Sequence, residues 1–415
     1  MLGDDAYYSQ PIALRHPIVF YEGHLPGFSF NTLVRKALGR PSIDARLEAL
    51  FARGIDPHEP SSHQASAWPS RDSVRDFAEE ADRQVLDALL HEDLARPGHP
   101  LLDRAEAVHS ILEHEAMHQE TLLYMWHRLP LGQKTRPAGY RPDTIGIPPP
   151  LEWIEVPGGS VTLGVDRGLA PFGWDNEQPS SVADVESFAI ERHDVTNLRF
   201  LEFVEAGGYQ DAGWWTETDW QWVRKEGVAH PLFWEREGDQ WRWRGMFDLI
   251  PLPLAWPVYV SLAEAMAFAR WSGARLPTEA EFQRAAFGSL EGERPHPWGS
   301  EEPSERTGVF DFASWDPLPA GTHPAGASAW GVEDLVGNGW EWTSTTFAPF
   351  PGFTAMAAYP EYSADFFDGE HFVLKGGSPV TARELLRPTF RNWFRARYPY
   401  VYATFRCAND RPGQA

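Results

Sequence analysis

The strongest chemical signature in this 415-residue sequence is the segment HEAMHQE at residues 114–120. At 100° per residue on a helix, His114 and His118 lie about 40° apart around the axis and about one turn apart along it. Two imidazoles placed in this way can bind one metal ion, so the pair predicts a metal site. A third ligand has to come from another helix.

The acidic residues of the same segment do not complete the site. Glu120 lies about 200° from His118 around the helix, so it points away from the metal face. The letters His114-Glu115-x-x-His118 match the HExxH pattern of zinc metalloproteases. The third ligand of those proteases is missing from its usual register, so the sequence disfavours a protease.

We expect the third ligand to be His24, in FYEGHLPGFSFN. His24 follows an apolar run and precedes Pro26 and Gly27, which suits the start of a helix that faces into a bundle. Other histidines of the same region remain open as alternatives, namely His16, His91, His99 and His109.

The composition limits what else the chain can do. The one cysteine, Cys407, excludes an intrachain disulfide, a CxxC redox pair and a cysteine-rich zinc site, so His and carboxylate groups must hold any metal. The formal net charge of −23 repels phosphate backbones and anionic membranes, so we expect neither nucleic acid nor membrane as a partner. No apolar stretch approaches the roughly 20 residues that span a bilayer. With no signal-peptide pattern at the N-terminus, we expect a cytoplasmic protein.

The elements that must position the histidines are helices in the first 130 or so residues. The helix that carries the histidine pair is expected from about Asp103 to Trp126. Shorter helices are expected in FNTLVRKAL and DARLEALFARG. Short connections between such helices predict a bundle. Another helix is indicated by apolar residues spaced mostly three and four apart, namely Val74, Phe77, Ala78, Ala81, Val85 and Ala88.

The amino-acid composition changes at residues 136–150, which contain five prolines and two glycines. Such a segment makes a poor helix and a poor central strand, so we place a linker there. From residue 151 onward the chain has short strands, many turns and few helices. We therefore expect a two-domain α+β protein with a helical domain at 1–135 and an irregular α+β domain at 151–415.

Two helices of the second domain are predicted by capping boxes, in which the cap hydroxyl and the N3 carboxylate exchange hydrogen bonds with the backbone. Ser261 with Glu264 opens one, and Thr278 with Glu281 opens the other.

These motifs resemble two known domains. The N-terminal half resembles the DinB-like four-helix domain, in which three histidines hold a metal: HEAMHQE matches its HxxxHxE motif, and YEGH matches the glycine–histidine of the third ligand. The C-terminal half resembles the formylglycine-generating-enzyme (sulfatase-modifying factor) fold, related to C-type lectins. The segments that carry this resemblance include GGSVTLG, ARLPTEAEFQRAA, DLVGNGWEWT, LKGGS and FRNWFRARYPYVYATFRCA.

The pairing of the two domains resembles the sulfoxide synthases of ergothioneine and ovothiol biosynthesis. The resemblance implies Fe(II) on His24, His114 and His118, with O2 as co-substrate. The implied product is a C–S bond between hercynine (trimethylhistidine) and cysteine or γ-glutamylcysteine. Iron follows from the resemblance alone, since three histidines suit zinc equally well.

Several relatives of this activity stay open. Ovothiol-type 5-histidylcysteine sulfoxide synthases usually carry a third, methyltransferase domain, so we expect the ergothioneine branch, the hercynine oxygenases. A selenoneine synthase, which couples hercynine to a selenosugar, has the same two-domain plan. Outside the family, the alternatives are a zinc-dependent thiol transferase and a lectin-like module that only binds ligands.

The resemblance further implies that the C-terminal stretch lies beside the iron. Hercynine carries a carboxylate and a trimethylammonium group, which suit arginine and aromatic partners. The predicted substrate-binding residues are Arg391, Asn392, Phe394, Arg395, Asn409 and Asp410.

A tyrosine near the iron commonly serves the family as proton donor. Where some members place it just after GGS, this chain has Pro379. We therefore name Tyr398, Tyr400 and Tyr402 as the candidate catalytic residues. In the GNGWEW motif, Trp340 and Trp342 are expected in the core.

Overall fold

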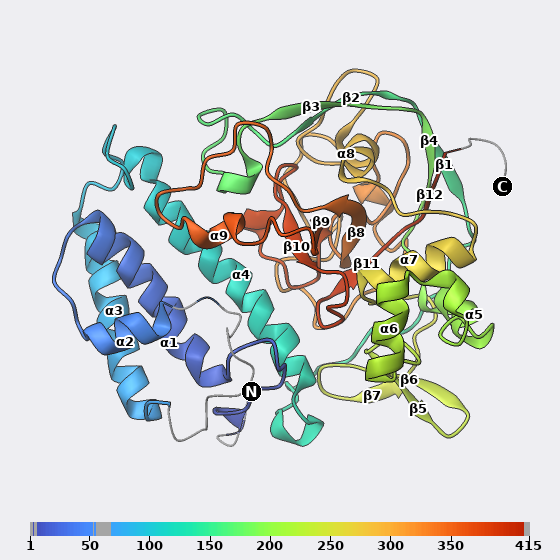
Figure 1. The fold of residues 1–415 in the computed structure, drawn as a ribbon, viewed down its shortest axis with the longest axis horizontal. Coiled ribbons are helices and arrows are strands. Elements are labelled where there is room, and N and C mark those ends of the chain that lie inside the picture. Colours follow the sequence, from blue (N-terminus) through green and yellow to red (C-terminus); the bar gives the residue numbers. More distant parts are fainter. Residues whose placement is uncertain (1–2, 4–5, 53, 55–67, 411–415) are drawn as a thin grey trace. The chain divides into compact units, whose positions relative to one another are not determined.

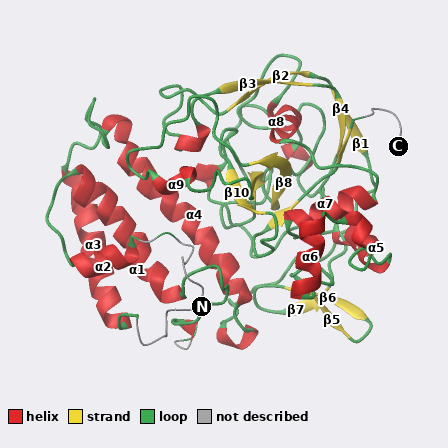
Figure 2. Cartoon of the chain, in the orientation of Figure 1, coloured by secondary structure: helices red, strands yellow, loops and turns green. Residues whose placement is uncertain are grey.

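The computed structural model describes residues 3, 6–52, 54 and 68–410, and the chain divides into two compact units. The first unit comprises Met1–Tyr140 and Met356–Pro360; the second comprises Arg141–Ala355 and Glu361–Ala415. Helices make up the first unit, and short strands, helices and long loops make up the second (Figure 2). The expected two-domain fold of mixed helices and strands is confirmed.

The first unit is a helical bundle in which α1 packs against α2, α3 and α4 (Figure 1). α1 continues without a break into the π-helix η2, so the two form one long element. The expected helix in FNTLVRKAL is therefore the π-helical end of a longer helix. The bounds are α1 (Ile18–Ser29), η2 (Phe30–Ala37), α2 (Ala45–Phe51), α3 (Arg71–His91), η4 (Asp103–Ala105), α4 (Glu106–Arg128) and η5 (Leu131–Gln133).

α1 corrects the expectation that His24 precedes a helix. Pro26 and Gly27 both lie inside α1, and the helix begins at Ile18. An interior proline removes one backbone hydrogen bond and costs about 3 kcal/mol. The run Ile18–Tyr21 is buried, and each such side chain contributes roughly 1.5–3 kcal/mol. Burial of the helix outweighs the cost of the proline.

α3 and α4 follow the predicted patterns. Ser70 caps α3, because its hydroxyl accepts the N–H of Ser73. α4 begins after a kink at Arg104 and Ala105, which have φ of 57° and 58°. The buried side chains of α3 are Val74, Phe77, Ala81, Val85 and Ala88, all of them on the predicted face.

The second unit is organised around a four-stranded sheet of order β10-β9-β8-β11, in which only the β8–β11 pair is parallel. The described residues of this unit also form three smaller sheets, with orders β1-β4-β12, β2-β3 and β5-β6-β7. The strands are β1 (Trp153–Val156), β2 (Gly159–Leu163), β3 (Ser181–Val185), β4 (Phe188–Glu191), β5 (Trp234–Glu237), β6 (Gln240–Arg244), β7 (Leu249–Pro251), β8 (Gly339–Thr346), β9 (His371–Gly377), β10 (Asn392–Arg395), β11 (Ala403–Thr404) and β12 (Ala408–Asn409).

Both capping boxes are confirmed at the starts of α7 and α8. The carboxylate of Glu264 accepts the N–H of Ser261 at 2.8 Å, and that of Glu281 accepts the N–H of Thr278 at 2.7 Å. The helices of this unit are α5 (Asn197–Glu205), α6 (Glu217–Glu226), α7 (Leu262–Trp271), α8 (Glu279–Phe287) and α9 (Glu361–Ala364), with 3-10 turns η6 (Asp175–Glu177), η7 (Ala212–Trp214), η8 (Pro324–Gly326) and η9 (Arg383–Leu385).

The core of the second unit is aromatic and includes buried charged groups. Trp340 and Trp342 are buried, as expected. Beside them Arg406 binds the carboxylate of Glu341 through two bonds, of 2.6 and 2.8 Å, and Asp194 at 3.2 Å. Within the described ranges, no helix is both long enough and apolar enough to cross a membrane.

Candidate metal centre

Three imidazoles from α1 and α4 converge inside the first unit. Nε2 of His118 lies 3.2 Å from Nε2 of His24 and 3.1 Å from Nε2 of His114. All three side chains are buried. In the part of the chain that the structure describes, no other group of three or more His, Cys, Asp or Glu side chains meets in this way.

The spacing of the nitrogens fits one metal ion. An ion bound at about 2.1 Å from each nitrogen would see neighbouring nitrogens about 3.1 Å apart at an angle of about 95°. Nε2 of His118 therefore lies close enough to both other nitrogens for the three histidines to hold one ion.

The electrostatic setting keeps the imidazoles neutral. Burial lowers the pKa of His24 to about 4. Burial, with the neighbouring imidazoles, also holds the pKa of His114 far below its usual range, and burial with His24 and Arg15 does the same for His118. Neutral imidazoles offer lone pairs to a cation without first losing a proton.

His24 is held by the end of a neighbouring helix. Its Nδ1 lies 2.7 Å from the carbonyl oxygen of Phe51, the last residue of α2. Because a carbonyl can only accept, Nδ1 carries the proton, and the lone pair is on Nε2, which faces the cluster. Phe20 adds a stacked contact to the His24 ring, with 4.8 Å between centroids.

Aromatic side chains that the sequence motifs did not predict lie against the cluster. Phe28 stacks on His114 with 3.5 Å between ring centroids and 10° between planes. The ring centroid of Tyr359 lies 6.1 Å from that of His114, and the ring centroid of Tyr21 lies 5.7 Å from that of His118. Phe28 and Tyr21 could have been found, since they stand four residues after and three before His24 on one helix. Tyr359 gives no such signal, because it belongs to the distant segment Met356–Pro360.

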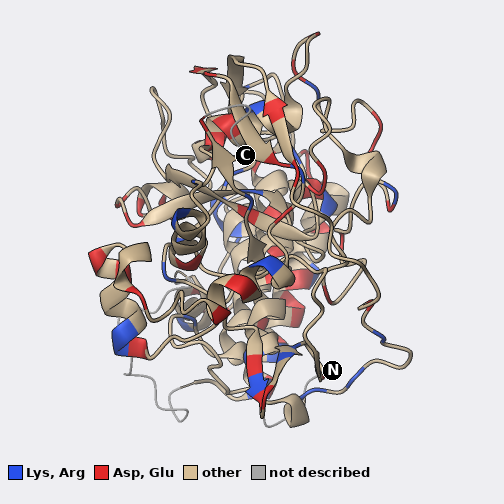
Figure 3. Ribbon diagram, turned by 90° about the vertical axis from the view of Figure 1, so that its right-hand side faces the viewer, with Lys and Arg blue, Asp and Glu red and all other residues tan. Residues whose placement is uncertain are grey.

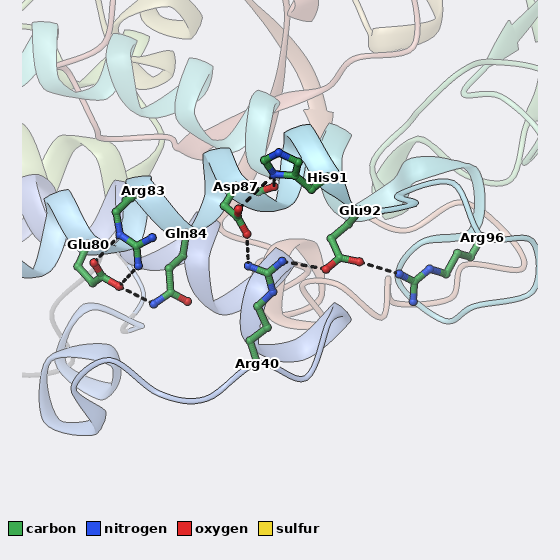
Figure 4. Close-up of polar contacts among 8 residues, drawn as sticks. All are labelled: Arg40, Glu80, Arg83, Gln84, Asp87, His91, Glu92 and Arg96. Carbon is green, nitrogen blue, oxygen red and sulfur yellow. Dashed lines mark hydrogen bonds and ion pairs between the residues drawn. The ribbon is translucent and has the colours of Figure 1, made fainter.

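The rival ligands have other surroundings. Nε2 of His16 lies 3.1 Å from the carbonyl of Gly54. His99 accepts two backbone N–H groups through Nδ1. His91 joins a polar network on α3, where its Nδ1 lies 3.1 Å from Asp87, which also binds Arg40 (Figure 4). Neither these three nor His109 nor Glu120 belongs to the metal-ligating group.

Three of the predicted substrate-binding residues already have partners within the second unit. The guanidinium of Arg391 donates to both carboxylate oxygens of Glu279, at 2.8 and 3.0 Å, and to two backbone carbonyls. Asp410 accepts from Arg275 at 2.7 Å. Asn409 lies in β12, beside β4. Among the described residues, these contacts of Arg391 are contacts within the fold. Its role in substrate binding stays a prediction.

The remaining predicted residues lie on or near β10 of the same unit. Asn392, Phe394 and Arg395 are in β10, paired with β9. Phe394 stacks on Tyr398 at 5.4 Å, and Tyr400 lies 4.9 Å from Tyr398.

Tyr402 packs at 5.6 Å from Tyr259 in the aromatic core, and at 6.0 Å from Phe233. That environment is typical of a structural tyrosine. The catalytic role of Tyr398, Tyr400 and Tyr402 stays a prediction.

Comparisons with known proteins agree with this architecture. The DinB superfamily matches residues 1–122, and the sulfatase-modifying factor enzyme 1-like domain matches residues 148–411. The sequence is 36% identical over 394 residues to the hercynine oxygenase of Mycolicibacterium smegmatis, across 84% of this chain and 88% of that protein. It is 35% identical over 405 residues to the hercynine oxygenase of Mycolicibacterium thermoresistibile, across 89% and 85%.

A third relative is similar to part of the chain. The formylglycine-generating enzyme of Mycobacterium tuberculosis is 31% identical over 308 residues, across 62% of this chain and 98% of that protein. Fold and site thus define a protein that joins a DinB-type helical domain, with a three-histidine cluster, to a sulfatase-modifying-factor domain. The chain belongs to the enzyme family of the hercynine oxygenases. The resemblance found in the sequence is confirmed.

Proposed function

We propose that this chain is an iron(II)- and O2-dependent sulfoxide synthase of ergothioneine biosynthesis, which joins hercynine to cysteine or γ-glutamylcysteine. The observation that carries the proposal is the meeting of three neutral imidazoles from two helices, in a chain that belongs to the hercynine oxygenase family. The nitrogen spacing of 3.1 and 3.2 Å supports a single ion shared by the three histidines.

His24, His114 and His118 would hold the iron. Iron(II) held there would supply coordination positions for the substrate imidazole, the donor thiolate and O2, and electrons for the reduction of O2. The protein's own contribution is to present three Nε2 lone pairs in a buried site. The Phe51 carbonyl keeps the proton of His24 on Nδ1, so that Nε2 stays free for the metal.

For the proton donor we propose Tyr359 ahead of the three tyrosines named from the sequence. Its ring lies 6.1 Å from His114 and 5.2 Å from Phe28, beside the cluster. A phenol O–H can donate a hydrogen bond or a proton, as this role requires. Tyr359 would give the proton of its Oη to a substrate held at the cluster.

Formylglycine formation is a poor alternative. The formylglycine-generating members of the second domain's fold use a pair of cysteines, and this sequence has only Cys407. Its thiol is buried, and burial together with Glu191 raises its pKa well above the usual range. A buried thiol of this kind is a weak nucleophile.

The test is anaerobic loading with Fe(II), followed by O2, hercynine and one donor at a time. Cysteine, γ-glutamylcysteine and a selenosugar form three arms, and products are identified by mass spectrometry while O2 uptake is recorded. We expect a sulfoxide from one of the two thiols, together with O2 consumption. A selenium-containing product alone would instead identify a selenoneine synthase. An Fe(II)-loaded protein that consumes no O2 with any donor would overturn the proposal.

A zinc-loaded sample separates this proposal from a thiol transferase. A zinc-dependent thiol transferase would use the metal to activate a thiolate without O2. We expect the zinc form to be inactive with every donor. Thiol transfer by the zinc form under nitrogen would contradict the iron- and O2-dependent reaction.

A further inference from the structure

Phe28 contacts three aromatic residues of the metal centre. Its ring stacks on His114 at 3.5 Å and 10°, and its centroid lies 5.2 Å from Tyr359 and 6.4 Å from His24. Phe28 follows His24 by four residues on α1, so one helix turn brings the two side chains to the same face. The Phe28 ring thus lies beside both His24, the predicted ligand from α1, and His114, a predicted ligand from α4.

The three histidines differ in what orients them. The Nδ1 proton of His24 is bound by the carbonyl of Phe51. Among the described residues, no hydrogen-bond partner lies within reach of Nδ1 of His114 or of His118, and both atoms are buried. Metal-binding histidines usually donate this second N–H to an oxygen, which fixes the plane of the ring. For His114 some other contact has to fix it.

The stacked face of Phe28 is that contact. The torsion that turns an imidazole about its Cβ–Cγ bond is broad, so without a hydrogen bond the ring has little intrinsic preference. Two flat rings 3.5 Å apart are at van der Waals contact, and turning one of them brings its edge into the other. Among the described residues His118 has no stacked ring of this kind, and its neighbour Tyr21 is tilted by 55° with 5.7 Å between ring centroids.

We propose that Phe28 is a positioning residue of the metal centre, which sets the plane of the His114 ring and thereby the direction of its Nε2 lone pair. The inference rests on the proposed function in one respect, namely that the cluster binds a metal. Phe28, on α1, would orient His114, on α4, by stacking on its ring, whereas the usual contact that orients a ligand is a hydrogen bond.

The test uses the full-length, metal-free protein and Co(II) alone as the probe. Phe28→Leu keeps apolar bulk but removes the flat face, and Phe28→Tyr restores a ring that can stack. Trp126→Leu is the matched control, because Trp126 is also a half-buried aromatic residue, two turns beyond His118 on α4, packed against Ala6, Ile18 and Leu129. Affinity is measured by competition with a chromophoric chelator, and the visible spectrum of bound Co(II) reports its coordination geometry.

We expect Phe28→Leu to weaken Co(II) binding by about 10- to 100-fold, the usual effect of losing a residue that orients a ligand. The Co(II) spectrum should change as well. Phe28→Tyr should restore both, and Trp126→Leu should leave both as in the wild type even if it lowers the melting temperature.

Three results would overturn the inference. The first is wild-type affinity and spectrum in Phe28→Leu, including the case in which only the KM for hercynine rises, since Phe28 would then contact substrate instead. The second is an equal loss in Phe28→Leu and Trp126→Leu, which would indicate general destabilisation. The third is a wild-type protein that binds no metal, which would remove the proposed function itself and is thus distinguishable from the first two.

Discussion

His118 is the central member of the cluster, because its Nε2 lies within 3.2 Å of the nitrogens of both other histidines. We expect His118→Ala to lower metal affinity by at least about 100-fold and to abolish turnover, since it removes a ligand outright. Metal content after gel filtration measures the first effect, and product formation the second. His91→Ala, which removes an exposed histidine, serves as the control and should leave both unchanged. A fully loaded His118→Ala protein would contradict the ligand assignment.

Tyr359→Phe tests the proton donor while leaving the ring in place. We expect turnover to fall by about 10²- to 10⁴-fold, the usual contribution of a general acid, with no change in metal affinity. The same substitution at Tyr398, Tyr400 and Tyr402 forms the comparison. If Tyr359→Phe keeps the wild-type rate and one of those variants loses it, the donor lies in the second unit.

Asp194 gives a prediction about pH. Burial, with the nearby Glu341 carboxylate, raises the pKa of Asp194 well above its usual range, and one of its oxygens lacks a partner among the described residues. Between the unfolded pKa near 3.9 and the raised folded pKa, the folded state binds more protons than the unfolded state. The contribution of Asp194 to stability therefore falls as pH rises through this window.

Asp194→Asn mimics the protonated carboxyl group and removes this dependence. We expect the stability of the variant relative to wild type to grow between pH 5 and pH 7.5, by up to about 1.4 kcal/mol per pH unit. Urea unfolding of both proteins at several pH values measures the difference. A difference that is constant, or that shrinks as pH rises, would show that Asp194 is ionised in the folded protein.

Some residues of the site could be predicted from the sequence and others could not. Two histidines one turn apart on a helix are visible because both lie in one short segment, and the search for a third ligand reduced to a few histidines. Phe28 and Tyr21 were within reach of the same helical spacing once His24 was known to lie inside α1. Tyr359 was not, since nothing local to residues 356–360 encodes which helix they pack against.

At the scale of elements, the packing of α1 on α2 depends on a glycine. A Cβ added at Gly23 would lie 2.3 Å from the ring of Phe51, the residue whose carbonyl holds His24. We expect Gly23→Ala to reduce the free energy of unfolding by about 1–3 kcal/mol, because the ring has to move. Urea denaturation measures this, and metal affinity should fall too as the carbonyl shifts.

Gly132→Ala is the matched control for that substitution. Gly132 is exposed, and a Cβ there would meet nothing within 4 Å. We expect its unfolding free energy to stay within about 0.5 kcal/mol of wild type. Equal stability of the two variants would mean that α1 and α2 tolerate a larger separation.

Elements whose signals are local were predicted well. The apolar spacing of α3, the capping boxes of α7 and α8 and the helix that carries His114 all depend on residues within a few positions of one another. The start of α1 was predicted too late in the sequence, because proline and glycine are common at helix boundaries. Burial of Ile18–Tyr21 instead stabilises a helix that begins at Ile18 and contains Pro26 and Gly27. That burial depends on helices distant in sequence, which local reasoning does not include.

At the scale of the whole molecule, the formal charge of −23 is the dominant long-range term. Positions of acidic and of basic residues are interspersed along the ribbon in this view (Figure 3). Net repulsion among surface carboxylates opposes the compact state and is screened by salt. We expect the melting temperature to rise by a few degrees between about 20 and 300 mM NaCl.

Calorimetry in NaCl, compared with sucrose of equal osmolarity, measures this effect. A melting temperature that falls as salt is added would show that attractive surface ion pairs, such as that of Arg83 with Glu80, outweigh the repulsion.

The return of residues Met356–Pro360 to the first unit bears on how the gene can be divided. A break placed in the proline-rich stretch would yield two polypeptides, the first with every histidine of the cluster and the second with Tyr359. On the proposed assignment neither product would be active by itself, whereas the first could still take up metal. Co-expressed halves would recover turnover only by reassociating, so the enzyme could serve as a fragment-complementation reporter.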